Sequence, residues 1–198
     1  MRSGMKVVLV ALAAGTLGVV ASMALNGPGP LLGTEAGQRV VQEAYRAAAP
    51  EPPPGVVIAK RDAPVSAFTV PELTGKAVAV PTAYAGRPLL INIWASWCGP
   101  CVKEMPELQR FHAQQGGKGT QVVGIALDDA AAVQEFLRRV PVAYPILIDT
   151  PGPGDAGVRL GNPKGVLPYS VLVSADGKLL KQRLGPFADG EIDSWARL

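Results

Sequence analysis

The chain has 198 residues, which is room for one ordinary domain and a short additional segment. Hydrophobic residues make up 48% of the chain, charged residues 18%, and the net charge at pH 7 is +3. This small positive charge is scattered, without a basic stripe or interleaved aromatic residues, which excludes a typical nucleic-acid-binding surface. Two cysteines are too few for the disulfide framework of a small secreted domain.

The first segment is an apolar run from Val7 to Leu25, with only mildly polar interruptions. Its length nearly spans the hydrocarbon core of a membrane. Because Arg2 and Lys6 precede it, residues 1–6 are expected to stay in the cytoplasm and the rest of the chain to be exported. A retained membrane anchor is favoured over a cleaved signal peptide, since signal-peptide apolar cores are usually shorter. Both interpretations export the rest of the chain. The third alternative, a buried helix of a soluble protein, would need apolar partners on all sides, which the rest of the chain does not obviously supply.

Residues 26–55 are predicted to be a linker that contains a short helix. The Gly-Pro-Gly-Pro sequence at 27–30 stops any preceding helix, and residues 34–49 place apolar side chains at helical spacing. The Pro-Glu-Pro-Pro-Pro-Gly sequence at 50–55 favours an extended conformation, because each proline fixes its own backbone angle and disfavours helix at the preceding residue. The folded domain is therefore expected to cover residues 56–198.

Strand and helix patterns alternate along this domain, which is the signature of an α/β fold. In chain order, the predicted elements are a hairpin of Phe68–Val70 and Ala77–Val80, a strand Leu89–Trp94, a helix Cys101–Gln115, a strand Gln121–Leu127, a helix Ala130–Arg139 capped by Asp128 or Asp129, an apolar segment Tyr144–Ile148, strands Tyr169–Val173 and Leu179–Leu184 around an Asp176-Gly177 turn, and a short helix from about Asp189. The strand Leu89–Trp94 is nearly continuously apolar, as expected of a strand that is buried on both faces. This buried strand leads directly to the two cysteines.

Cys98 and Cys101 stand where the buried strand turns into a helix. The first turn of a helix has unpaired N–H groups and a partial positive charge, so a thiol there is stabilised as the reactive thiolate. We predict that Cys98 attacks a client disulfide and that Cys101, one turn further, resolves the mixed disulfide. Pro100 fits the first helical turn, where its missing N–H costs nothing, and Gly99 lets another polypeptide approach closely.

Other roles for the cysteine pair have less support. A zinc site would need two further ligands, but the chain has no other cysteine and its single histidine, His112, lies about three turns along the same helix. A structural disulfide that closes so short a loop would remove little entropy from the unfolded chain. Buried inert thiols are the remaining alternative. We therefore favour redox chemistry in which the Cys98/Cys101 disulfide is itself the redox centre, with no metal and no separate cofactor.

The string Asn-Ile-Trp-Ala-Ser-Trp-Cys-Gly-Pro-Cys at 92–101, followed by Lys-Glu-Met-Pro at 103–106, resembles the TlpA/ResA-like branch of the thioredoxin superfamily. The resemblance runs from Phe68 to the C-terminus and places Gly185 where the superfamily has a glycine facing the disulfide. It implies a central mixed sheet flanked by helices and a membrane-anchored or exported protein, and residues 141–164 resemble the central insertion typical of this branch. With the N-terminal hairpin and the apolar segment read from the residues, the predicted fold is a thioredoxin-like α/β domain preceded by a transmembrane helix. The resemblance also implies thiol-disulfide exchange, usually in the reducing direction.

Glu104 is the third candidate catalytic residue. It follows Cys101 by three residues and precedes Leu108 and Phe111 at helical spacings, so it falls on the apolar face of the helix. Burial would raise the pKa of its carboxyl and let it pass a proton to or from Cys101 during exchange. The resemblance assigns a buried glutamate to this place, with Asn92 replacing the buried acid of cytoplasmic thioredoxins. The alternative is a solvent-facing charge partnered by a neighbouring lysine.

The expected client-binding residues are Trp97, Gly99, Pro100, Leu167 and Pro168. The resemblance favours a cis bond at Pro168 over an ordinary trans proline, and a cis bond would expose backbone groups of Leu167 next to Cys98 for pairing with an extended client segment. Trp97 is expected to form a wall of the site. The sequence at 166–170, Val-Leu-Pro-Tyr-Ser, departs from the Pro-Thr-Thr that is common in the family, which leaves client preference open.

The sequence thus predicts a monomeric, membrane-tethered thiol-disulfide oxidoreductase at the bacterial inner membrane, with its catalytic domain on the periplasmic or extracytoplasmic side. Its expected partners are disulfide-containing client proteins and a membrane thiol electron donor, without nucleic acid. The client classes left open are apocytochromes during cytochrome maturation, and general or copper-site disulfides. One alternative is an oxidase or isomerase, because a change of about 30 mV in the potential of the cysteine pair, which helps to set the direction of exchange, corresponds to only about 1.4 kcal/mol. The other alternative is a client-binding module without turnover.

Overall fold

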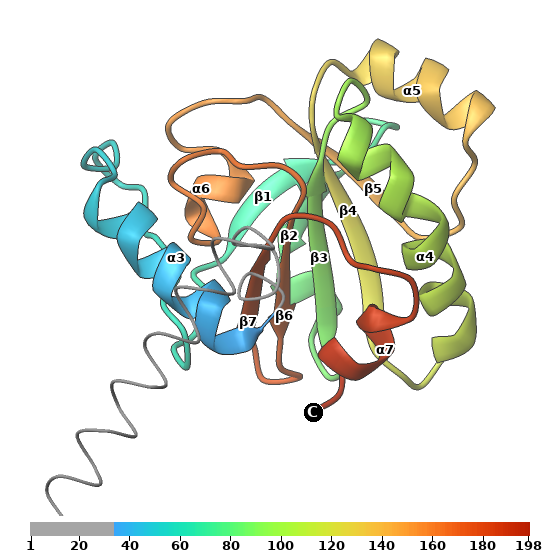
Figure 1. Ribbon diagram of the computed structural model, residues 1–198. Coiled ribbons are helices and arrows are strands. Elements are labelled where there is room, and N and C mark those ends of the chain that lie inside the picture. Colours follow the sequence, from blue (N-terminus) through green and yellow to red (C-terminus); the bar gives the residue numbers. More distant parts are fainter. Residues whose placement is uncertain (1–33) are drawn as a thin grey trace, which may run out of the picture. The chain divides into compact units, whose positions relative to one another are not determined.

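The computed structural model describes residues 34–198 of the chain. The chain divides into two compact units after Val41, and the second unit contains the central sheet (Figure 1). The predicted membrane segment Val7–Leu25 lies outside the described residues. Within residues 34–198, no helix combines the length and apolar character that crossing a membrane requires.

Five strands form the central sheet of the second unit, in the order β5-β4-β3-β6-β7 (Figure 1). They are β3 (Leu89–Trp94), β4 (Gln121–Leu127), β5 (Ile146–Asp149), β6 (Tyr169–Val173) and β7 (Leu179–Leu184). Strands β3, β4 and β5 run parallel, whereas β6 and β7 pair antiparallel, so the sheet is mixed as predicted. Every residue of the central strand β3 is buried, which explains its continuous apolar sequence.

Helices and a hairpin cover the two faces of this sheet. One face carries α4 (Gly99–Gln115), α5 (Ala130–Arg139) and α7 (Glu191–Trp195), and the other carries α6 (Ala156–Arg159) and the hairpin of β1 (Phe68–Pro71) and β2 (Ala77–Val80), which η1 (Thr82–Tyr84) follows (Figure 1). Side chains alternate along β3. Leu90 and Trp94 pack with the α4 face, and Ile91 and Ile93 with the opposite face.

The helix ends follow local capping chemistry. Helix α4 begins two residues before its predicted start, because Cys98 itself is the N-cap. Asp129 rather than Asp128 caps α5, since its carboxylate accepts the N–H groups of Ala131 (2.9 Å) and Ala132 (3.2 Å). The bounds of β4, α5, β6 and β7 coincide with those predicted. The last helix begins at Glu191, two residues later than expected.

The segment 141–164, in which an insertion is expected, contributes buried side chains to the cores on both faces of the sheet. It contains β5, the edge strand that pairs with β4, and the short helix α6. The predicted apolar segment Tyr144–Ile148 overlaps strand β5, which starts at Ile146. Pro145 has no N–H to donate to a strand partner, but its carbonyl accepts the Gly124 N–H at 3.0 Å.

Residues 42–55 of the predicted linker belong to the second unit. A helix, α3 (Glu35–Ala47), forms where amphipathic spacing was noted, and it spans the division between the two units. In the second unit, Gln42 Nε2 donates to the Gln182 carbonyl at 2.8 Å, and Lys164 Nζ donates to the Ala48 carbonyl at 2.7 Å. The C-terminal part of this segment is thus fixed to the sheet domain through side-chain hydrogen bonds.

Candidate active site

Cys98 lies four residues after the last residue of β3, Trp94, and is the N-cap of α4. Its sulfur accepts the backbone N–H of Cys101 at 3.3 Å, while its carbonyl accepts the N–H of Val102 at 3.1 Å. The two cysteines form a disulfide with their Cα atoms 5.3 Å apart. When this bond is reduced, the free N–H groups and partial positive charge of the helix start favour a thiolate at Cys98 over a neutral thiol.

The two cysteines differ in their exposure to solvent. Cys101 is fully buried, whereas Cys98 is 5% exposed and is surrounded in sequence by the exposed Trp97, Gly99 and Pro100. A side chain added at Gly99 would meet no atom within 4 Å, so space beside Cys98 is open. Trp97 is 70% exposed, an unusual position for so large an aromatic ring. This asymmetry favours Cys98 as the sulfur that meets a client.

The loop that carries Cys98 is held by Asp128, which follows β4. One carboxylate oxygen of Asp128 accepts both the N–H of Ser96 (2.9 Å) and its hydroxyl (2.6 Å). The Cys98 N–H donates to the Ala95 carbonyl at 3.1 Å. Sequence reasoning assigned Asp128 only as an alternative helix cap. The sequence signal for this contact was the position of Asp128 at the carboxyl end of a strand parallel to β3. The carboxyl ends of neighbouring parallel strands lie at the same end of a sheet, so Asp128 could be expected near the loop that follows β3.

The Leu167-Pro168 peptide bond is cis, as the family resemblance implied. Pro168 immediately precedes β6, whose first residue, Tyr169, pairs with Ile93 near the end of β3, so the proline lies at the same sheet edge as the cysteines. Leu167 packs against the buried cluster that contains both cysteines. The Pro168 carbonyl accepts the N–H of Gly185 at 2.9 Å.

Glu104 is 2% exposed, so the predicted apolar-face position is confirmed and a solvent-facing charge is wrong. Its Oε1 accepts Asn92 Nδ2 at 2.8 Å, and its Oε2 accepts the backbone N–H of Phe187 at 3.0 Å. Burial raises the pKa of Glu104 to about 7, against the lowering effect of these two hydrogen bonds and of the Arg183 charge. Glu104 thus exchanges its proton near neutral pH.

A polar strip crosses the sheet beneath Glu104. Asn92, Ser170 and Arg183 are register partners on β3, β6 and β7, so their side chains share the face that α4 covers. Asn92 Nδ2 also donates to the Ser170 hydroxyl at 3.0 Å, and all three residues are buried. Sequence reasoning identified Asn92 and Glu104 but missed Ser170, Arg183 and the Phe187 N–H. Asn92 from this strip and the Phe187 N–H from the loop after β7 each donate one hydrogen bond to the buried carboxylate.

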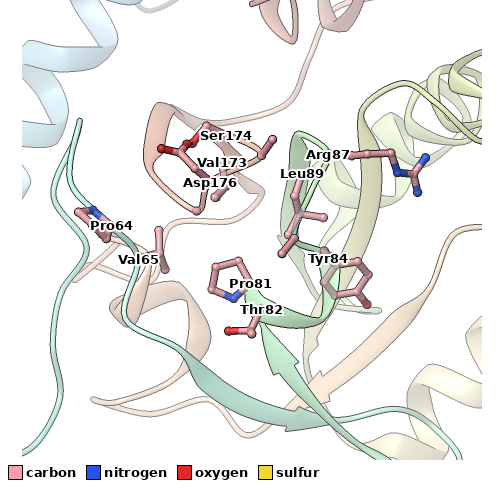
Figure 2. Close-up of a pocket in the computed structure, with 13 residues that line it drawn as sticks. Pro64, Val65, Pro81, Thr82, Tyr84, Arg87, Leu89, Val173, Ser174 and Asp176 are labelled. Carbon is pink, nitrogen blue, oxygen red and sulfur yellow. The ribbon is translucent and has the colours of Figure 1, made fainter.

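A separate cavity of about 250 Å³ lies at the other end of β3 (Figure 2). Leu89, the first residue of β3, and its register partner Val173 line this cavity together with Pro81 and Tyr84. The Val80-Pro81 bond is also cis, which sequence reasoning did not predict. Because β3 separates the cavity from Cys98, the cavity does not belong to the disulfide site. Among residues 34–198, no three His, Cys, Asp or Glu side chains cluster as metal ligands would.

Comparisons with known proteins identify the family of this chain. A model of the Redoxin family matches residues 60–196. The thiol-disulfide oxidoreductase ResA of Bacillus thuringiensis (strain Al Hakam) is 29% identical over 133 residues, which cover 66% of this chain and 73% of that protein. The sporulation thiol-disulfide oxidoreductase A of Bacillus subtilis is 24% identical over 148 residues, covering 72% of this chain and 86% of that protein.

Solved structures share the fold. The crystal structure of a putative thiol:disulfide interchange protein DsbE from Chlorobium tepidum matches with a TM-score of 0.59 at 27% identity, covering 69% of this chain and 94% of that one. The crystal structure of StoA from Bacillus subtilis matches with a TM-score of 0.54 at 22% identity, covering 67% of this chain and 98% of that one. The second likeness concerns the thioredoxin-like fold alone.

Proposed function

Because the chain belongs to the redoxin family and is a TlpA/ResA-like protein thiol:disulfide oxidoreductase, we propose that it acts as a reductant of disulfides in proteins outside the cytoplasm. The observation that carries the exchange chemistry is the position of the Cys98 sulfur at the start of α4, where it accepts the Cys101 N–H, whereas the reducing direction rests on the family resemblance. A sulfur in this place is a good nucleophile and also a good leaving group, because its thiolate is stabilised.

The first chemical step joins the chain to its client. The Cys98 thiolate attacks one sulfur of a client disulfide, the client S–S bond breaks, and the other client sulfur leaves as a thiolate that takes a proton from water. A mixed disulfide between Cys98 and the client remains. We expect the exposed ring of Trp97 and the backbone of Leu167, before the cis proline, to hold an extended client segment beside Cys98.

The second step releases the client and uses Glu104. The Cys101 thiol gives its proton to the Glu104 carboxylate, and the resulting thiolate attacks the Cys98 sulfur. The mixed disulfide breaks, the client leaves with its second thiolate, and the Cys98–Cys101 disulfide forms. Glu104 then passes its proton to the departing client sulfur. Overall, one client disulfide is reduced to two thiols while the two cysteines of this chain are oxidised to one disulfide.

The chain needs an electron donor to act again. We assign this role to a dithiol carrier in the membrane, which would reduce the Cys98–Cys101 disulfide by the same exchange in the opposite direction. The apolar sequence Val7–Leu25 after Arg2 and Lys6 supports a membrane tether with the catalytic domain on the extracytoplasmic side. A tethered enzyme would meet both the membrane donor and exported clients, including apocytochromes and copper-site proteins.

The direction of electron flow is tested by the midpoint potential of the Cys98/Cys101 couple. We expect the full chain, equilibrated in dithiothreitol redox buffers and trapped with a thiol reagent, to give a value near that of thioredoxin, about −270 mV. A potential near about −120 mV, typical of a strong periplasmic oxidant, would overturn the assignment as a reductant. The Cys98→Ala chain is the control, since it forms no internal disulfide and should show no transition.

A further inference from the structure

Arg183 is a buried cation that the exchange chemistry above does not use. It lies on β7, 7% exposed, on the face of the sheet that α4 covers. Its Nη1 and Nη2 donate to the two carboxylate oxygens of Glu191, at 2.6 and 2.9 Å. Nη2 also donates to the Pro186 carbonyl at 2.8 Å. Such a two-point ion pair fixes direction as well as distance, which a single point charge does not.

These contacts clamp the loop between β7 and α7, residues 185–190. The Glu191 carboxylate also accepts the Ala188 N–H at 2.8 Å. Arg183, before the loop, thus bonds Pro186 within it, and Glu191, after the loop, bonds Ala188. The Arg183 guanidinium lies 4.8 Å from the centre of the Phe187 ring, which itself packs against Trp195 with ring centres 5.1 Å apart. The backbone of Phe187 is therefore held in one orientation.

The Phe187 N–H points at Glu104. It donates to Glu104 Oε2 at 3.0 Å, and a backbone N–H can only donate, so this bond favours the ionised carboxylate over the protonated one. Other elements also face Glu104. Cys101 lies on its own helix, Asn92 on β3 donates to Oε1, and the Arg183 charge on β7 favours ionisation. Tyr144, whose pKa is raised by burial and by the Glu104 charge, is neutral near pH 7.

We propose that Arg183 is a positioning residue of the exchange reaction: with Glu191 it holds the 185–190 loop so that the Phe187 N–H keeps Glu104 able to accept the Cys101 proton. The inference rests on the proposed function, because it assigns Arg183 a role in the second step of the exchange. It acts through Glu104 and does not touch the sulfurs. The competing role is a purely structural one, in which the Arg183–Glu191 pair only anchors α7.

An aromatic disulfide that releases a coloured thiolate separates the two steps. The first burst of colour reports attack by Cys98, and the second reports attack by Cys101. In the full-length Arg183→Met chain, loss of the charge and of the loop clamp favours the protonated form of Glu104. The midpoint of the second phase should therefore move to higher pH by roughly half a unit to one unit, which slows that phase about 3- to 10-fold below the midpoint. The first phase should not change.

Three further variants make the assignment specific. Arg183→Lys keeps the charge but not the two parallel hydrogen bonds, so its shift should be smaller than that of Arg183→Met. Arg138→Met removes the exposed ion pair with Glu135, also 2.6 Å long, and should leave the midpoint unchanged. In a Glu104→Gln chain, Arg183→Met should cause no additional change, because its effect passes through Glu104.

The possible results separate this inference from the function on which it rests. If Arg183→Met exchanges disulfides with an unshifted second-phase midpoint, Arg183 is only structural and the inference is wrong, while the proposed function stands. If Arg183→Met does not fold, Arg183→Lys decides by the same criterion. If the unmodified chain releases no coloured thiolate at all, the proposed function itself fails.

Discussion

Replacing Cys101 with Ala should turn a transient complex into a stable covalent one. Cys98 would still attack a client disulfide, but no second sulfur would be within reach to break the mixed disulfide. We expect client turnover to fall to below about one thousandth of the unmodified rate, the scale of loss seen when a bond-breaking group is removed. The measurement is gel electrophoresis without reductant, on which client adducts of the Cys101→Ala chain should accumulate and disappear when dithiothreitol is added.

The Cys98→Ala chain is the matched control for this trapping experiment. It keeps the buried Cys101 but lacks the sulfur at the helix start, so it should form no adducts and show no turnover. Client that stays with Cys101→Ala through non-covalent contacts alone, and is released by denaturant without reductant, would instead identify a binding module. Adducts formed equally by both variants would show that Cys98 is not the attacking residue.

Replacing Glu104 with Gln should slow the second step of exchange by about 100-fold near neutral pH. The pKa of Glu104 is raised to about 7, so below that pH the carboxyl already holds a proton and cannot accept one from Cys101. The second phase should therefore accelerate through about pH 7 in the unmodified chain, and this rise should be missing in Glu104→Gln. The aromatic-disulfide assay measures both profiles.

The same shift predicts how stability depends on pH. Glu104 binds its proton more tightly in the folded chain, with a pKa of about 7, than in the unfolded chain, where the value is 4.5. The folded state therefore holds more protons between these values, and the free energy of unfolding should fall as pH rises through this window. The contribution is up to about 3 kcal/mol, since one pKa unit corresponds to about 1.4 kcal/mol. Urea unfolding at several pH values should show this slope.

Glu135→Gln is the control for both effects of Glu104. It removes an exposed carboxylate from α5. It should change neither the second phase near neutral pH nor the slope of stability between about pH 4.5 and about pH 7. A Glu104→Gln chain that keeps the unmodified rate and the unmodified slope would mean that Glu104 is not the proton acceptor.

Sequence patterns identified the parts of the fold that depend on local chemistry. The bounds of β4, α5, β6 and β7 follow from hydrophobic periodicity, a capping aspartate and an Asp-Gly turn, all of which lie within a few residues of the element. The site was predictable for the same reason. Cys98, Cys101 and Glu104 belong to one strand-to-helix segment, where spacing alone decides which side chains share a face.

The remainder of the site depends on how distant segments meet. The Phe187 N–H reaches Glu104 across 83 positions in sequence, and Ser96 reaches Asp128 across 32. These contacts follow from the strand order β3-β6-β7 and from the loop after β7, which local periodicity does not determine. The cis bond at Pro81 was missed because cis and trans prolyl bonds differ by only about 1 kcal/mol. No family motif indicated whether the bond before Pro81 is cis or trans.

The claim on which this account depends is that the start of α4 keeps Cys98 reactive while Cys101 waits, protonated, behind it. Alkylation of the reduced full chain with iodoacetamide over a range of pH, read by mass spectrometry at each cysteine, tests it most directly. We expect Cys98 to be modified at least about 10-fold faster than Cys101 at neutral pH, with a half-maximal rate below about pH 8.5, the ordinary value for a thiol. Equal, slow modification of both cysteines that rises only above that pH would contradict the account.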